Sequence, residues 1–299
     1  MTTDRAHDPI LWSTIAVVVL VAVTAAAGLY WPATYTRETP LSRAAGYGSD
    51  VVDLFLVVPV LLISGVRAYR GSVPARLVWL GTQGYLLYNF VIYAFGVHFN
   101  SLFLVYCATL GICLYATVFS LPSLPLERVA QTYRLRAPRK TIAIMLLVLA
   151  VSTAVFDLRE DIAAILAGTV PQAVIAANQP VNFAHVLDLV FLLPALAITA
   201  TLLLRRRASG YALAPVLLTL LVIMNVELAS IMVELGRWGL GMSLPMIVFF
   251  AALGMGLTVL LGVYFSRGRR AVVAGVASGT EVGMPPTEEP AEDAEVHGE

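Results

Sequence analysis

Residues 10–30 form an uncharged, mostly apolar run, ILWSTIAVVVLVAVTAAAGLY. About 20 such residues are enough to cross the hydrocarbon core of a bilayer as a helix. Similar runs recur, and we predict eight spans, roughly at 10–31, 51–69, 75–96, 101–121, 140–157, 182–204, 211–234 and 244–265. Since lipid offers no hydrogen-bond partner to an open strand, the predicted fold class is an all-α, eight-helix membrane bundle.

The composition supports this assignment and excludes several classes of protein. Of the 299 residues, 59% are hydrophobic and 13% are charged, whereas soluble domains carry about 25% charged residues. The formal net charge is zero, which argues against a nucleic-acid binder. A soluble enzyme and a disulfide-rich secreted domain are also excluded, and the expected surroundings are a lipid bilayer.

The basic residues predict how the bundle is oriented. Fifteen of the 19 lie in the N-terminus and in the segments after spans two, four, six and eight. The opposite segments hold only Arg37, Arg43, Arg159 and Arg237. Because Lys and Arg accumulate in short cytoplasmic loops, we expect both termini to be cytoplasmic.

The segments between spans suggest a division of the chain. We expect an N-terminal half at 1–121 and a C-terminal half at 140–265, joined by a basic cytoplasmic linker at 122–139. The tail at 266–299 is rich in Gly, Pro and Ala and then acidic, which predicts disorder. Between the fifth and sixth spans, the apolar stretch 162–177 predicts a short helix on the membrane surface.

The two halves carry a similar series of residues. An ordered Asp, Pro, Arg and Asn recurs at closely matching spacing: Asp53, Pro59, Arg70 and Asn89 in the first half, and Asp188, Pro194, Arg205 and Asn225 in the second. We therefore predict an internal duplication, with two parallel four-helix repeats related by an axis along the membrane normal. The alternative is chance, because Asp and Arg are common at the ends of spans.

Three stretches also resemble a known group of proteins. These are DLFLVVP at 53–59, GYLLYNF at 84–90 and HVLDL at 185–189. Over roughly residues 50–265 the chain resembles a widespread bacterial family of multi-pass membrane proteins with no assigned activity. The resemblance implies a location in the bacterial inner membrane, and it transfers no catalytic or binding residue.

Polar residues inside the membrane mark the predicted binding site. An ionisable group there is costly, and its presence is by default a functional hypothesis. Most such residues fall in the outer half of the predicted spans, which suggests a cavity that opens to the outside. The candidate substrate-binding residues are Asp53, Asn89, His185, Asp188, Asn225 and Glu227.

Each candidate also has a purely structural interpretation. Asp53 and Asp188 would lie in the first turn of their helices, where a carboxylate complements the helix dipole. Asn89 and Asn225 could form hydrogen bonds between helices. Glu227 is too deep for capping and has no Lys or Arg within its span, so it is either functional or a neutral, hydrogen-bonded side chain. We expect it to face the interior, because a carboxylate exposed to lipid would cost roughly 2.5–3.5 kcal/mol.

The sequence leaves several functions open. It contains no P-loop, Gly-x-Ser-x-Gly, His-Glu-x-x-His or Cys-x-x-Cys motif, so we predict no cofactor and no metal, and an enzyme is not favoured. The preferred hypothesis is a small-molecule or lipid-handling carrier in which Glu227 couples to protons. The alternatives are a membrane-embedded lipid-modifying enzyme that uses Asp53, Asp188 or His185 as acid or base, and a structural or assembly partner in the membrane.

Overall fold

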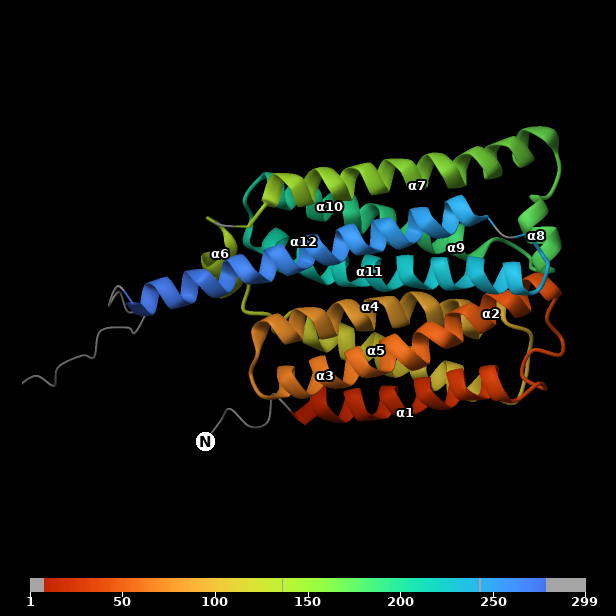
Figure 1. The fold of residues 1–299 in the computed structure, drawn as a ribbon, viewed down its shortest axis with the longest axis horizontal. Coiled ribbons are helices and arrows are strands. Elements are labelled where there is room, and N and C mark those ends of the chain that lie inside the picture. The colour runs from red at the N-terminus through yellow and green to blue at the C-terminus, as the bar shows by residue number, and fades with distance from the viewer. Residues whose placement is uncertain (1–7, 136, 242, 278–299) are drawn as a thin grey trace, which may run out of the picture.

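The chain forms an elongated bundle of helices that run side by side (Figure 1). The computed structural model describes residues 8–135, 137–241 and 243–277, and these ranges contain no strand. In order, the helices are α1 (Asp8–Tyr30), α2 (Pro40–Val52), η1 (Asp53–Val57), α3 (Val58–Tyr69), α4 (Val73–Gly96), α5 (Phe103–Ser120), α6 (Leu126–Tyr133), α7 (Arg139–Ala167), α8 (Gln172–Ala177), α9 (Phe183–Leu187), η2 (Asp188–Leu192), α10 (Leu193–Leu204), α11 (Ala208–Arg237) and α12 (Leu244–Ala277).

Seven helical rods of the described residues are long and apolar enough to cross a membrane. They correspond to all the predicted spans except the third, which is α4. This helix has 24 residues, but it buries Thr82, Gln83 and Asn89 among its neighbours. A helix shielded from lipid by other helices has no need of an apolar surface. The prediction of a multi-pass membrane protein is therefore supported, whereas the eighth span stays a prediction.

The second span begins about a dozen residues earlier than predicted. α2, η1 and α3 form one rod from Pro40 to Tyr69, and the Thr39 hydroxyl caps it by accepting from the Ser42 amide at 3.2 Å. The prediction failed here because residues 40–50 include Arg43 and Asp50 and are therefore poorly hydrophobic. Asp53 consequently lies in the middle of a helix, and the prediction that it caps the first turn is wrong.

Both Asp53 and Asp188 begin a short π-helical segment. The Val58 amide donates to the Asp53 carbonyl in η1, and the Leu193 amide donates to the Asp188 carbonyl in η2. A proline follows in each case, Pro59 or Pro194. Proline has no N–H and its ring clashes with the carbonyl four residues earlier, so a locally wider turn accommodates it. The two matching stretches thus share an uncommon local structure.

Three other predicted boundaries change. α7 runs to Ala167, so the predicted surface helix at 162–177 is reduced to the short α8. The segment 122–139 is not merely a linker, because it contains α6, which packs against α11 and α12. α12 extends to Ala277, beyond the position 266 at which the tail was predicted to begin. The acidic residues from 281 onward lie outside the described ranges.

α11 lies at the centre of the bundle. It packs against α2 and α4 of the predicted first half and against α10 and α12 of the second. Glycines allow the close approach: a Cβ on Gly48 would lie 2.6 Å from the Ile231 Cα, and one on Gly81 would lie 2.5 Å from the Val216 carbonyl oxygen. The two predicted halves therefore share an extensive interface through this helix.

The connections between helices gather at two ends of the bundle. One end holds α8 together with the α1–α2, α4–α5 and α11–α12 connections, and we call it the α8 end (Figure 1, right). The opposite end, called the α6 end, holds α6 and the start of α1. The polar residues of interest lie toward the α8 end.

Candidate functional site

A partly open cavity of about 320 Å³ lies toward the α8 end. Residues of α2, α4, α8, α9 and α11 line it, together with residues of the connecting segments. Its walls combine apolar side chains with hydroxyl, amide and carboxyl groups, and the polar members include Tyr35, Glu38, Ser49, Tyr88, Asn89, Tyr93 and Glu227. A concave site with a few convergent polar groups is the usual form of a small-molecule site.

Three buried carboxyl groups lie at and beside this cavity, and we call Asp50, Asp53 and Glu227 the carboxyl cluster. Asp50 is fully buried in α2. It accepts a hydrogen bond from the Tyr35 hydroxyl at 2.6 Å and another from the Tyr93 hydroxyl at 2.7 Å. Each oxygen of the Asp50 carboxyl group therefore has its own phenolic donor.

Asp53 is held in the same manner from α4. The Tyr85 hydroxyl donates to one carboxyl oxygen at 3.0 Å, and the Asn89 amide donates to the other, also at 3.0 Å. The same amide lies 3.2 Å from the Tyr85 hydroxyl. Asn89 thus forms the hydrogen bond between helices that was predicted for it, and it also lines the cavity.

Glu227 joins α11 to α2. Its carboxyl group accepts from the Ser49 hydroxyl at 2.6 Å, and it also lies close to Tyr85. One turn further along α11, the Ser230 hydroxyl donates to the Gly48 carbonyl at 2.8 Å. Glu227 is buried and lines the cavity, as expected for a residue that faces the interior.

The carboxyl cluster is held by neutral donors. Within the described residues, none of the ion pairs involves Asp50, Asp53 or Glu227. Their hydrogen bonds come from tyrosine and serine hydroxyls and from one amide. A negative charge placed on this cluster would therefore have no basic side chain beside it.

Tyr35 reaches the cluster from the connection between α1 and α2, outside the spans. Burial, and then the neighbouring Asp50 carboxyl group, raise the pKa of Tyr35 well above its ordinary value of 10. The hydroxyl therefore keeps its proton at neutral pH and acts as a donor to Asp50.

A second polar group, called here the histidine cluster, consists of Asp157, Asp161, His185 and Asp188. The His185 ring nitrogens lie 3.6 Å from Asp157 Oδ1 and 3.1 Å from Asp161 Oδ1. Asp188 lies near Asp157 and Tyr88. One buried oxygen of Asp157 and one of Asp188 have no hydrogen-bond partner. In the described part of the chain, no three His, Cys, Asp or Glu side chains are placed to hold a metal ion.

The six predicted site residues thus separate into groups. Asn89 and Glu227 line the cavity, and Asp53 contacts Asn89 directly. His185 and Asp188 belong to the histidine cluster, which does not line the cavity. Asn225 donates to the Leu221 carbonyl of its own helix at 2.8 Å, so the expected hydrogen bond to another helix is not found.

Four further members of the site were not predicted from the sequence, namely Asp50, Tyr35, Tyr93 and Ser49. Asp50 precedes Asp53 by three residues, a spacing that places both on one helix face. The sequence shows this pair, but two carboxyl groups without a histidine make a poor metal site, and the span was predicted to begin after Asp50. The tyrosines come from other elements, and only the packing of α2 against α4 and the α1–α2 connection reveals them.

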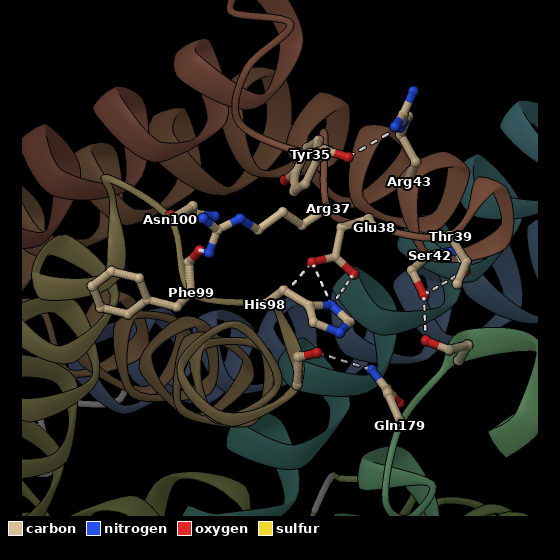
Figure 2. A network of polar contacts seen from close by, with 12 residues as sticks. Tyr35, Arg37, Glu38, Thr39, Ser42, Arg43, His98, Phe99, Asn100 and Gln179 are labelled. Carbon is tan, nitrogen blue, oxygen red and sulfur yellow. Dashed lines mark hydrogen bonds and ion pairs between the residues drawn. The ribbon is translucent and has the colours of Figure 1, made fainter.

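A polar rim, which includes the lining residues Glu38, Ser42 and Gln179, lies next to the cavity (Figure 2). The rim ties three connections together through Arg37, Glu38, Ser42, His98 and Gln179. Glu38 accepts from the His98 amide at 2.7 Å, and Arg37 donates to the Phe99 carbonyl at 3.0 Å. Gln179 donates to the Gly96 carbonyl at 3.2 Å, and Ser42 donates to the Ala177 carbonyl at 3.4 Å.

No family model, curated protein or solved structure matches the chain. The chemistry of the site is therefore inferred from its geometry. Buried carboxyl groups beside a mostly apolar cavity can exchange protons and can bind a small molecule, and neither process requires a covalent intermediate.

Proposed function

We propose that this protein is a carrier that binds a small molecule in the cavity at the α8 end. The observation that carries the proposal is the position of Glu227. Its carboxyl group is buried in a helix long and apolar enough to span the membrane, and it also lines a partly open cavity. An ionisable group is costly to place in a membrane, and its presence there is by default a functional hypothesis.

The proposed coupling ion is the proton. Glu227, Asp50 and Asp53 form one cluster whose donors are neutral, so gaining or losing a proton changes the net charge beside the cavity. Ligand binding and protonation at Glu227 would then influence each other, because linkage between two sites is reciprocal. A carrier of this type moves its ligand together with, or in exchange for, protons.

The proposal includes a location and an orientation. The resemblance described above and the distribution of basic residues favour the bacterial inner membrane with both termini cytoplasmic. The α8 end, and with it the mouth of the cavity, would then face the outside.

The proposal also retains the internal duplication. In its favour, η1 and η2 have the same hydrogen-bond pattern and are followed by the same proline. The packing of α1 on α3, α3 on α4 and α4 on α5 is matched by α7 on α10, α10 on α11 and α11 on α12. One difference is that α1 packs extensively against α5, whereas α7 and α12 have no comparable contact.

Mass spectrometry of small molecules that co-purify with the detergent-solubilised protein tests the proposal. Wild type should release a compound that the Glu227→Gln variant retains poorly, because Gln mimics the protonated acid and cannot ionise. Glu234→Gln is the matched control on the same helix, since Glu234 pairs with Arg237 and does not line the cavity. Identical sets of compounds from wild type and both variants would contradict the carrier.

One observation favours a second candidate, a lipid-modifying enzyme. His185 lies between two carboxyl groups, an arrangement that can orient an imidazole as a general acid or base. The lipid composition of cells expressing wild type should then differ from that of cells expressing His185→Gln. If only Glu227→Gln alters a measured activity, the carrier is favoured.

For the third alternative, an assembly partner, the cavity offers no support.

A further inference from the structure

We infer that the cavity at the α8 end takes an organic cation, either a small amine or a quaternary ammonium compound. This inference rests on the proposed function, because it assumes that the cavity is a ligand site, and it adds the chemical class of the ligand. Charge, aromatic walls and size each support it independently.

The described residues that line the cavity include acidic side chains but no basic ones. Among the described residues that line the cavity, Glu227 and Glu38 carry carboxyl groups, and no Lys, Arg or His contributes to the wall, although the His98 ring lies 3.1 Å from Glu38. Asp50 lies immediately behind the wall, in hydrogen-bond contact with the lining residues Tyr35 and Tyr93. A low-dielectric cleft that is lined by carboxylates and by no basic group attracts cations and repels anions.

Aromatic rings supply the second feature. Tyr35, Tyr88, Tyr93 and Phe183 line the cavity, and they come from three different parts of the chain. A cation over the face of an aromatic ring is attracted by the ring quadrupole, and such cages recognise quaternary ammonium groups. Tyr93 is fixed in place by its hydrogen bond to Asp50 and by stacking on Phe90 at a centroid distance of 5.3 Å.

The size of the cavity argues for an organic rather than a metallic cation. Its volume is about 320 Å³, whereas a single water occupies about 30 Å³ in the liquid. The described residues offer no set of three ligating side chains, so a bare metal ion would be poorly coordinated. Leu41, Ile92 and Met224 also line the cavity and suit methyl or methylene groups next to a charged nitrogen.

A matched pair of probes tests the inference on the full-length protein in detergent or nanodiscs. Choline carries a quaternary nitrogen. Its uncharged analogue 3,3-dimethyl-1-butanol, called dimethylbutanol here, has the same shape with a carbon atom in place of that nitrogen. Isothermal titration should show that choline binds at least about tenfold more tightly than dimethylbutanol, because only choline carries a positive charge that the aromatic rings and carboxyl groups attract. Equal or tighter binding of dimethylbutanol would overturn the inference.

Two variants locate the binding. Glu227→Gln should weaken choline binding by about tenfold or more and leave dimethylbutanol unaffected, whereas Glu234→Gln should bind choline as wild type does. If Glu227→Gln unfolds, Tyr88→Leu replaces it, because this change removes one ring from the wall. Unchanged choline binding in the folded variant would overturn the inference.

The same measurements separate this inference from the proposed function. If the protein retains a neutral or anionic compound in a Glu227-dependent manner and does not bind choline, the cation inference fails and the carrier stands. If choline binds through Glu227 but reconstituted vesicles show no choline uptake at any pH gradient, the carrier fails and the cation site stands.

Discussion

Asp50 illustrates how a buried carboxyl group in this bundle is satisfied by hydrogen bonds. Both of its carboxyl oxygens are occupied, by Tyr35 at 2.6 Å and Tyr93 at 2.7 Å, and the residue is fully buried. A buried polar group left without a partner costs about 1–3 kcal/mol. Asp50 therefore has a structural role as well as an electrostatic one, because it satisfies two tyrosines from different elements.

The first prediction concerns this residue. Asp50→Ala leaves both hydroxyls without their acceptor and should destabilise the protein by about 2–4 kcal/mol. Asp50→Asn preserves one carbonyl acceptor and should cost clearly less. Thermal unfolding of the detergent-solubilised variants measures the difference. Equal melting temperatures for the two variants would show that the tyrosines find other partners.

Tyr35 gives a prediction for alkaline pH. Its pKa is raised above 10 in the folded protein by burial and by Asp50, so the tyrosine ionises more readily when unfolded. The stabilisation it provides is fully present below pH 10 and is lost as the pH rises from 10 toward the folded pKa. The stability difference between wild type and Tyr35→Phe should therefore shrink above pH 10. A constant difference up to pH 11 would contradict this.

The histidine cluster gives a third prediction. His185→Ala removes the imidazole that faces Asp157, a residue that is almost fully buried and already has one unpartnered oxygen. The loss should be about 1–3 kcal/mol. Replacing Asp157 by Leu in the same chain should restore much of it, because the buried carboxyl group that lost its partner is then removed. A double variant less stable than His185→Ala would argue against a direct interaction.

At the residue scale, the sequence predicts burial better than it predicts partners. The inward direction of Glu227 follows from the cost of exposing a carboxylate to lipid. Its partner, Ser49, is 178 residues away and lies just outside the predicted second span, so no local pattern connects the two. Asn225 was expected to resemble Asn89, but its amide is used by its own helix.

At the scale of the elements, the close packing of α2 on α11 depends on a small residue. A Cβ at Gly48 would meet the backbone of Ile231 at 2.6 Å, and Ser49, the donor to Glu227, is the next residue. Gly48→Leu should cost at least about 1–3 kcal/mol through overpacking and should weaken any ligand binding that depends on Glu227. Gly111→Leu in α5 is the matched control, since a Cβ there meets no atom. Thermal unfolding of both variants checks the expectation, and equal stability would contradict it.

The elements themselves were largely predictable, because bilayer thickness sets the length of an apolar run. Hydropathy is misleading where a helix is covered by other helices. α4 buries Gln83 and Asn89 and is therefore less apolar than its neighbours. The first turns of α2 were not predicted as part of a span because they are polar. The π-helical segments had a signal in Pro59 and Pro194, but a proline does not specify how the helix adapts.

At the scale of the whole molecule, the orientation is the prediction to test first. Thr169 is exposed at the α8 end, and Ser209 lies at the α6 end. With Cys107 and Cys113 replaced, Thr169→Cys should react with a membrane-impermeant maleimide in intact cells, and Ser209→Cys should react only after lysis. The reverse pattern would place the mouth of the cavity in the cytoplasm.

The arrangement of the halves was the hardest feature to predict. Sequence periodicity shows which segments cross a membrane, but it does not show which helix lies in the middle. α11 occupies that position because Gly48 and Gly81 on its neighbours allow their backbones to approach it closely. Such contacts depend on two segments far apart in the chain, and a pattern within either segment does not reveal them.

The position of Glu227 also has a consequence for biosynthesis. The donors to Asp50 and Asp53 all precede α5, so the nascent chain can satisfy both groups early. Glu227 emerges 178 residues after Ser49, roughly 10–35 s later at about 5–20 residues per second. When α11 leaves the ribosome, its carboxyl group meets a serine that α2 has already positioned. The order of translation thus matches the order in which the buried acids find their partners.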